Sequence, residues 1–153
     1  MLSILIVDDD ADLLGTMVDA LGDRYAVSCA SDGPAAIAAI TATPERFDLL
    51  ITDLHMPGMT GVEVKQELDR QSVDLPMILV SSDLQVGTLA TSAGFFDFLS
   101  KPLSFDLLET AVARVAAERD QRISSFEIPA AAAPLVEVRV EVRGNDDPEP
   151  EGA

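Results

Sequence analysis

The sequence predicts one α/β domain in which five short strands alternate with five helices, as a parallel sheet covered by helices on both faces. Three observations predict it. The strand candidates are apolar runs almost without polar alternation, which is typical of strands buried on both faces. Capped helical segments separate them with short connections. The 153 residues suffice for one such core and an appendage, but not for two ordinary domains.

The first two units follow from apolar runs and caps. Ser3–Val7 is a continuous apolar strand candidate that ends in three aspartates. Apolar residues at helical spacing predict a helix over residues 11–22, which Asp10 is placed to cap. Residues 25–31 are the second strand candidate. A turn with proline at a first helical position then opens a helix that ends near residue 42.

The third unit leads from a strand into a loop rich in turn residues. Residues 47–52 form the strand candidate, and Asp53 stands at its end. Thr60 and Glu63 have the spacing of a capping box, which predicts a helix that runs to about residue 70.

The last two units differ in the strength of their helices. Residues 76–80 are an apolar strand, and Ser82 with Gln85 is expected to form a second capping box. The helix that follows contains glycine, threonine and serine, so we expect it to be short or easily frayed. Residues 96–99 are the fifth strand, and Ser104 is expected to cap the final helix. We expect one face of that helix to carry Leu107, Leu108, Ala111, Val112 and Val115.

Polar residues stand at the carboxyl ends of the predicted strands, where ligands bind in doubly wound folds. Clustered carboxylates repel one another and favour a bound cation, and oxygen ligands suit Mg²⁺. We expect Asp9 and Asp53 to coordinate directly, the backbone carbonyl of His55 to add an oxygen and Asp8 to act through a water. Asp10 is assigned to helix capping. The alternative is that Asp8 to Asp10 are solvated turn residues.

Lys101 and Ser81, at the ends of two other strands, favour the functional interpretation. A carboxylate beside Mg²⁺, with an ammonium and a hydroxyl nearby, is what a phosphoryl acceptor requires. Asp53 is then the nucleophile as well as a ligand.

These residues resemble the receiver (CheY-like) domain of two-component response regulators. The resemblance covers about residues 1–123 and depends on four stretches in order: residues 4–9 with the acidic pair, residues 53–61, Ser81 after an apolar strand, and residues 94–102, which end in Lys-Pro. It implies a flavodoxin-like sheet with strand order 2-1-3-4-5 and a receiver domain over residues 1–124.

The resemblance also implies a role for each matched residue. Asp53 is similar to the phosphorylated aspartate of the family, Asp8 and Asp9 to its acidic pair, Lys101 to its lysine and Ser81 to its switch hydroxyl.

Further positions of the resemblance concern the switch and its surroundings. Pro102 would follow a cis peptide bond, and Phe98 stands at the switch aromatic, with ordinary core packing as the alternative. Phe95 stands where the family usually has a small residue, and the stretch 81–94 is slightly shorter than is usual in the family. Both departures are expected to alter the geometry of the fourth helix. His55 could screen or guide water at the acyl phosphate, although an exposed loop histidine is the preferred interpretation.

Composition excludes several classes of function. Ten basic against 27 acidic residues give a net charge of -17, which disfavours nucleic acid and anionic membranes as direct partners. A lone Cys29 excludes an intrachain disulfide and indicates a reducing compartment. His55 is the only histidine, which excludes a multi-histidine zinc site within the chain. Without a visible targeting or spanning segment, we expect a cytoplasmic protein.

The composition changes after residue 124. Residues 129–134 are linker-like, residues 135–143 alternate strictly as a strand does, and the remainder is acidic, proline-rich and expected to be disordered. Two copies of the strand paired antiparallel about Val140 would place Glu137 opposite Arg143, which predicts a homodimer. A disordered tail, or a strand added to the edge of the chain's own sheet, is the alternative.

The expected function is that of a single-domain response regulator. A histidine kinase or histidine phosphotransfer protein would phosphorylate Asp53 in a Mg²⁺-dependent reaction, and a downstream protein would bind the altered surface. Such a protein catalyses its own phosphorylation and dephosphorylation without conventional turnover. There are three alternatives. The protein is a scaffold that binds partners constitutively with an idle site, an intermediate of a phosphorelay, or a receiver domain cut from a longer regulator.

Overall fold

The computed structural model describes residues 1–83 and 85–127 of the chain. The predicted linker, the strand over residues 135–143 and the acidic tail lie outside the described residues. The chain divides into two compact units, Met1–Val112 and Ala113–Ala153. The sheet and every residue of the candidate site belong to the first unit.

Five parallel strands form one sheet in the order β2-β1-β3-β4-β5, which confirms the predicted fold class and strand order. β1 has its predicted boundaries, the boundaries of the other strands differ by a residue or two, and β3, β4 and β5 each continue one residue further at the carboxyl end. The strands are β1 (Ser3–Val7), β2 (Ala26–Ala30), β3 (Leu49–Asp53), β4 (Met77–Ser81) and β5 (Asp97–Ser100).

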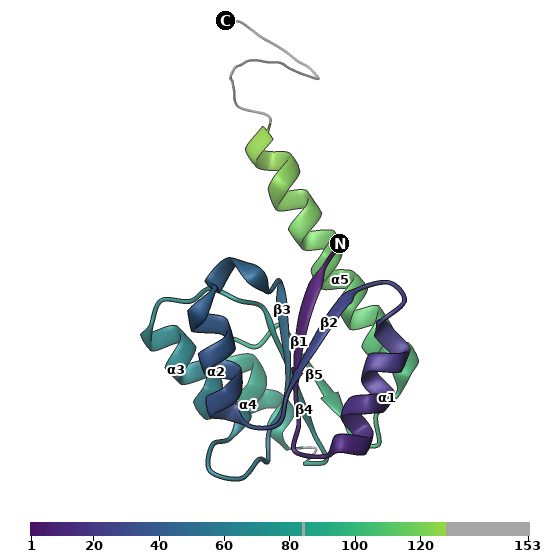
Figure 1. Cartoon of the computed structure of the whole chain (residues 1–153), viewed down its shortest axis with the longest axis vertical. Helices are drawn as coiled ribbons and strands as arrows, with labels where there is room; N and C mark the ends of the chain where they lie inside the picture. The colour runs from purple at the N-terminus through teal and green to yellow at the C-terminus, as the bar shows by residue number, and fades with distance from the viewer. Residues whose placement is uncertain (84, 128–153) are drawn as a thin grey trace, which may run out of the picture. The chain divides into compact units, whose positions relative to one another are not determined.

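Helices cover both faces of the sheet (Figure 1). α2, α3 and α4 lie on one face, and α1 and the first part of α5 lie on the other. A short 3-10 helix, Pro44–Arg46, precedes β3. The helices are α1 (Ala11–Leu21), α2 (Gly33–Ala42), α3 (Gly61–Arg70), α4 (Val86–Ser92) and α5 (Phe105–Glu127). Among the described residues, no helix combines the length and apolar character needed to cross a membrane.

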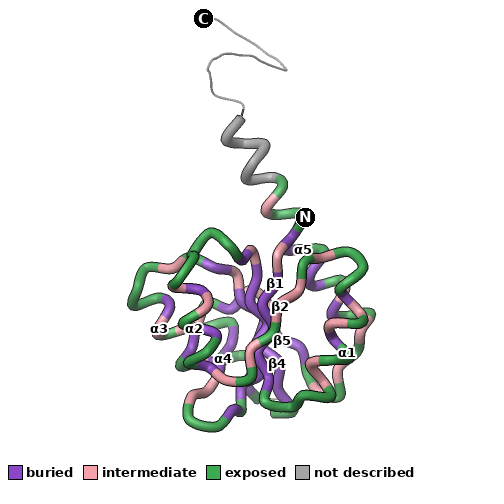
Figure 2. Tube along the Cα trace, viewed as in Figure 1, coloured by how far each residue is buried: buried purple, intermediate pink, exposed green. Residues whose placement is uncertain are grey.

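The core lies around the three central strands. All residues of β3 and β4 and four of the five in β1 are buried, whereas the edge strand β2 is partly exposed (Figure 2). Ile4, Leu50 and Ile78 are fully buried. Each such side chain contributes about 1.5–3 kcal/mol of hydrophobic stabilisation relative to an exposed position. This packing makes the sheet a rigid base for the residues at its end.

The predicted caps of α1, α3 and α5 are present, and α2 is capped by a residue that was not predicted as a cap. Asp10 accepts hydrogen bonds from the backbone N–H groups of Asp12 and Leu13. Asp32 caps α2, and Thr60 and Glu63 form both bonds of the capping box of α3. The side chain of Ser104 accepts from a backbone N–H at the start of α5.

The capping box predicted for Ser82 and Gln85 is wrong. Because β4 includes Ser81, whose hydroxyl accepts from the N–H of Asp83, the helix starts only at Val86. Gln85 stands at the cap position without a side-chain hydrogen bond, and its own N–H donates to the carboxylate of Asp83. α4 has seven residues, which agrees with the expectation of a short helix.

The predicted buried face of the last helix is wrong at Leu107. Its side chain is 60% exposed, whereas Leu108, Ala111 and Val112 are buried. The three buried residues have the i, i+3, i+4 spacing of one helix face, and Leu107 is rotated about 100° away from Leu108.

Candidate functional site at the carboxyl edge of the sheet

The polar residues singled out in the sequence follow four neighbouring strands. Asp8 comes directly after β1, Asp53 ends β3, Ser81 ends β4, and Lys101 comes directly after β5. The register pairs Asp53 with Val80 and Ser81 with Ser100. Because the strands are parallel and adjacent, their carboxyl ends share one edge of the sheet.

Three carboxylates form a cluster at this edge. One oxygen each from Asp8, Asp9 and Asp53 lies within 4.8 Å of the others. Asp8 and Asp53 are buried, whereas Asp9 and the side chain of His55 are exposed. An all-oxygen donor set with one solvent-facing member suits a hard divalent cation that keeps part of its water shell, as Mg²⁺ does. The cluster is typical of the magnesium site of receiver domains.

Lys101 places its ammonium between two of these carboxylates. Its Nζ lies 3.2 Å from Oδ1 of Asp53 and 3.4 Å from Oδ2 of Asp8. Burial opposes the charge of Lys101, but the attraction of Asp53 and Asp8 outweighs burial and raises the pKa of Lys101. The lysine therefore stays charged and offsets part of the acidity of the cluster.

The electrostatics of Asp53 differ from those of a surface aspartate. Burial is the largest cause that raises its pKa, and the charge of Asp8 acts in the same direction. Lys101 lowers the pKa again without cancelling the increase. A bound cation would favour the ionised form of Asp53, which is the nucleophilic form.

The backbone of Asp53 is held by neighbours that the sequence reasoning did not identify. A Cβ on Gly61 would lie only 2.5 Å from the carbonyl oxygen of Asp53, so any larger residue at the start of α3 would force the backbone to shift. The buried Thr52 donates its hydroxyl proton to the same carbonyl at 3.0 Å. In the sequence, only the glycine directly after the predicted cap Thr60 could have signalled this close approach.

Ser81 is fully buried, and hydrogen bonds connect it to Lys101 and to Asp83. Its carbonyl accepts from the N–H of Lys101 at 2.9 Å, and its Oγ accepts from the N–H of Asp83 at 3.0 Å. Asp83 was missing from the predicted site residues. Its position two residues after the strand end is typical of turns in which a side chain binds nearby backbone.

Phe98 and Phe95, at and near the predicted switch, lie beside residues of α4. Phe98 is partly buried, and its ring lies about 3.5 Å from where a Cβ of Gly87 in α4 would stand. Phe95 is buried in the hydrophobic core together with Ala90 of α4. The peptide bond between Lys101 and Pro102 is cis, as the resemblance implied.

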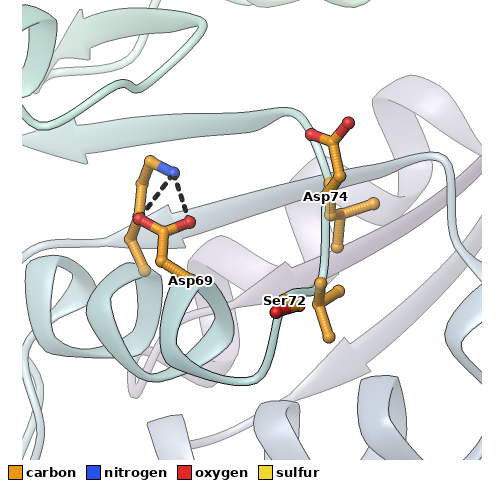
Figure 3. Close-up of a pocket in the computed structure, with 6 residues that line it drawn as sticks. Asp69, Ser72 and Asp74 are labelled. Carbon is orange, nitrogen blue, oxygen red and sulfur yellow. Dashed lines mark hydrogen bonds and ion pairs between the residues drawn. The ribbon is translucent and has the colours of Figure 1, made fainter.

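A shallow hollow lies at the carboxyl end of α3, away from the acidic cluster (Figure 3). Its lining includes Lys65, Asp69, Ser72 and Asp74, and the ammonium of Lys65 is paired with Asp69 at 3.0 Å. A ten-residue helix is about 15 Å long. This hollow is therefore separate from the acidic cluster, which lies beside the start of α3.

Comparison with known proteins gives consistent matches. A family model, the response regulator receiver domain, matches residues 4–113. The two-component response regulator ARR14 of Arabidopsis thaliana is 35% identical over 105 residues, which are 67% of this chain and 28% of that protein. The C4-dicarboxylate transport transcriptional regulatory protein DctD of Rhizobium meliloti is 32% identical over 120 residues, 76% of this chain and 26% of that protein. The chain thus spans little more than a quarter of either relative.

Solved structures agree in fold. The chemotaxis response regulator CheY4 of Vibrio cholerae is 29% identical with a TM-score of 0.68, covering 75% of this chain and 98% of that one. A response regulator receiver domain protein from Clostridium thermocellum reaches a TM-score of 0.73 at 25% identity, covering 79% and 98%. With its acidic cluster, its lysine and these matches, the chain belongs to the response regulator receiver domain family.

Proposed function

We propose that this protein accepts a phosphoryl group on Asp53 from a histidine kinase or histidine phosphotransfer protein, and that the phosphorylated form signals by binding a downstream protein. The observation that carries the proposal is the contact of Lys101 with Asp53 inside the acidic cluster. Receiver domains partner with histidine kinases, and one sensor protein, EvgS of Escherichia coli, matches this chain at 35% identity over 119 residues.

The carboxylates of Asp8, Asp9 and Asp53, with the backbone carbonyl of His55, would hold Mg²⁺. The ion supplies positive charge that offsets the repulsion between the carboxylates and the oxygens of the incoming phosphoryl group. Asp9 is exposed, so the cluster remains open to a donor on its solvent side.

In the proposed transfer, a carboxylate oxygen of Asp53 attacks the phosphorus atom of a phosphohistidine. An O–P bond forms while the P–N bond of the donor breaks, and its electron pair stays on the imidazole nitrogen, which takes up a proton. The ammonium of Lys101 attracts the phosphoryl oxygens, and the hydroxyl of Ser81 donates a hydrogen bond to one of them.

We place the signalling surface on α4, β5 and the start of α5. Apart from Met1, the large hydrophobic side chains that are exposed in the described part of the chain are Leu89 of α4 and Leu107 of α5. In the proposed complex, the apolar surface of these two side chains would be buried against the downstream protein. Phe98, which lies against α4, would change position when Ser81 engages the phosphoryl group.

Location and assembly are part of the proposal. We propose a cytoplasmic protein, and the net charge of -17 supports one that does not bind nucleic acid or anionic membrane directly. The alternating residues 135–143 support a homodimer. Light scattering of a variant that ends at residue 124 tests the dimer, and an unchanged oligomeric state would refute it.

A small phosphodonor such as phosphoramidate, added with Mg²⁺, tests the central step. We expect intact-protein mass spectrometry to show one added phosphoryl group, which is absent in Asp53→Asn and in the presence of EDTA. Lys101→Ala is expected to fold and to lose phosphorylation-dependent partner binding. If no donor modifies Asp53, the constitutive scaffold is the better explanation.

A further inference from the structure

The hydroxyl of Ser81 has two hydrogen-bonding capacities, and the structure shows the use of one. Its oxygen accepts from the backbone N–H of Asp83 at 3.0 Å. A hydroxyl can donate its proton while it accepts through a lone pair. Ser81 can therefore donate to a group bound at Asp53 and keep its bond to Asp83.

Asp83 is attached to the start of α4 by two further bonds. Its Oδ1 accepts from the N–H of Gln85 at 3.0 Å, and its carbonyl oxygen accepts from the N–H of Val86 at 3.2 Å. Gln85 itself provides no side-chain cap. Since the first N–H groups of a helix lack partners within the helix, Asp83 satisfies groups that α4 would otherwise leave to water.

The stability of α4 depends on these hydrogen bonds because the helix itself is weak. It has only seven residues and includes Gly87, which disfavours a helix by about 1 kcal/mol relative to alanine. The ring of Phe98 lies against Gly87, one residue after Val86. A displacement of the first turn of α4 therefore reaches the predicted switch aromatic directly.

We propose that Asp83 is a positioning residue that fastens the hydroxyl of Ser81 to the first turn of α4, so that movement of this hydroxyl is passed to the helix through the side-chain hydrogen bond of Asp83. The proposal rests on the proposed function for its signal, because the phosphoryl group on Asp53 is what would move the hydroxyl. Its mechanical part, the coupling between Ser81 and α4, holds without phosphorylation.

Hydrogen exchange of residues 85–92 in the full chain tests the mechanical part first. Without phosphodonor, Asp83→Ala is expected to speed exchange at the start of α4 about fivefold, the effect of one lost hydrogen bond of about 1 kcal/mol. Asp83→Asn keeps an oxygen acceptor and is expected to restore the slow exchange. Asp74→Ala, which removes one exposed negative charge before β4, is the matched control and should leave α4 unchanged.

A double-mutant cycle separates coupling from simple loosening. Ser81→Ala should also speed exchange in α4, and combination with Asp83→Ala should add less than the product of the two effects, because both changes break one connected pair of bonds. Independent, multiplicative effects would overturn the proposal, as would an Asp83→Asn variant that behaves like Asp83→Ala.

The signalling part is measured with phosphoramidate and Mg²⁺. Asp83→Ala is expected to be phosphorylated, because Asp83 contributes no atom to the acidic cluster, but the change in exchange of α4 on phosphorylation should be lost. A full response of α4 in phosphorylated Asp83→Ala would refute the link. If wild-type Asp53 takes no phosphoryl group, the proposed function fails, and the cycle without donor still decides the coupling.

Discussion

The surroundings of Asp53 in the folded protein disfavour its charged form. Burial and the neighbouring Asp8 raise the pKa of Asp53 in the folded protein above its value in the unfolded chain. As the pH rises between these two values, the unfolded chain loses its proton first, so the folded state becomes relatively less stable. This penalty is complete above the folded pKa and absent below the unfolded one.

The neutral Asp53→Asn variant should therefore be more stable than the wild type. In magnesium-free buffer at pH 7 we expect a higher urea midpoint, and we expect the gain to vanish below about pH 4, where the unfolded aspartate is protonated. Asp74→Asn, at an exposed position, should show no such pH-dependent gain. A gain of equal size at pH 3 and pH 7 would contradict this account.

Gly61 is the residue on which the backbone position of Asp53 depends most directly. A Cβ would meet the carbonyl oxygen of Asp53 at 2.5 Å and the side chain of Leu79 at 2.9 Å. We expect Gly61→Ala to lower the free energy of unfolding by about 1–3 kcal/mol, as overpacking does. Gly15→Ala is the control: nothing lies within 4 Å of its Cβ, and alanine should stabilise α1 by up to about 1 kcal/mol. Urea unfolding of both variants measures the contrast.

At the scale of elements, α4 is the helix with the least intrinsic support. Gly87 faces the ring of Phe98 with space for a methyl group, since the added carbon would be in ordinary contact at 3.5 Å. Gly87→Ala should therefore slow hydrogen exchange within α4 up to about fivefold through helix propensity alone. Gly94→Ala should instead speed hydrogen exchange in the turn that follows α4. Gly94 has a φ of +90°, and the Cε of Lys65 lies 3.2 Å from the added carbon. Faster exchange of α4 in Gly87→Ala would contradict the assigned packing.

Apolar runs and cap residues predicted the strands and most helix starts, because burial on both faces and capping are local properties of the sequence. Asp10, Thr60 and Ser104 accept hydrogen bonds at the starts of the helices that they were expected to cap. The predicted start of α4 was wrong because the hydroxyl of Ser81 accepts a hydrogen bond from the N–H of Asp83. Whether that bond forms depends on where β4 ends. Leu107 was misassigned because spacing alone does not show which side of a wide apolar stripe meets the sheet.

The acidic cluster and Lys101 were predictable because parallel strands bring their carboxyl ends to one edge. Gly61, Thr52 and Asp83 were missed. Gly61 approaches the carbonyl of Asp53 only after folding. Thr52 and Asp83 bond to residues one and two positions away, and apolar runs and helix caps do not indicate such bonds at strand ends.

For the whole molecule, the charge of -17 sets how ions act on stability. Monovalent salt screens the general repulsion, whereas Mg²⁺ that binds only the folded state adds RT ln(1 + [Mg²⁺]/Kd) to the free energy of unfolding. We expect MgCl₂ to raise Tm more than NaCl of equal ionic strength. Asp9→Asn should abolish most of this difference, and Asp74→Asn should preserve it. Equal shifts with both salts in the wild type would contradict a specific cation site.

The chain contains only two lysines, and the structure places them in very different surroundings. Lys101 lies between Asp53 and Asp8, whereas Lys65 is paired with Asp69 on α3. Reductive methylation with ¹³C-formaldehyde would give an NMR spectrum with one signal from each lysine and one from the N-terminal amine. The Lys101 signal would then monitor the acidic cluster in solution, with Lys65 as its internal reference, without a single engineered label.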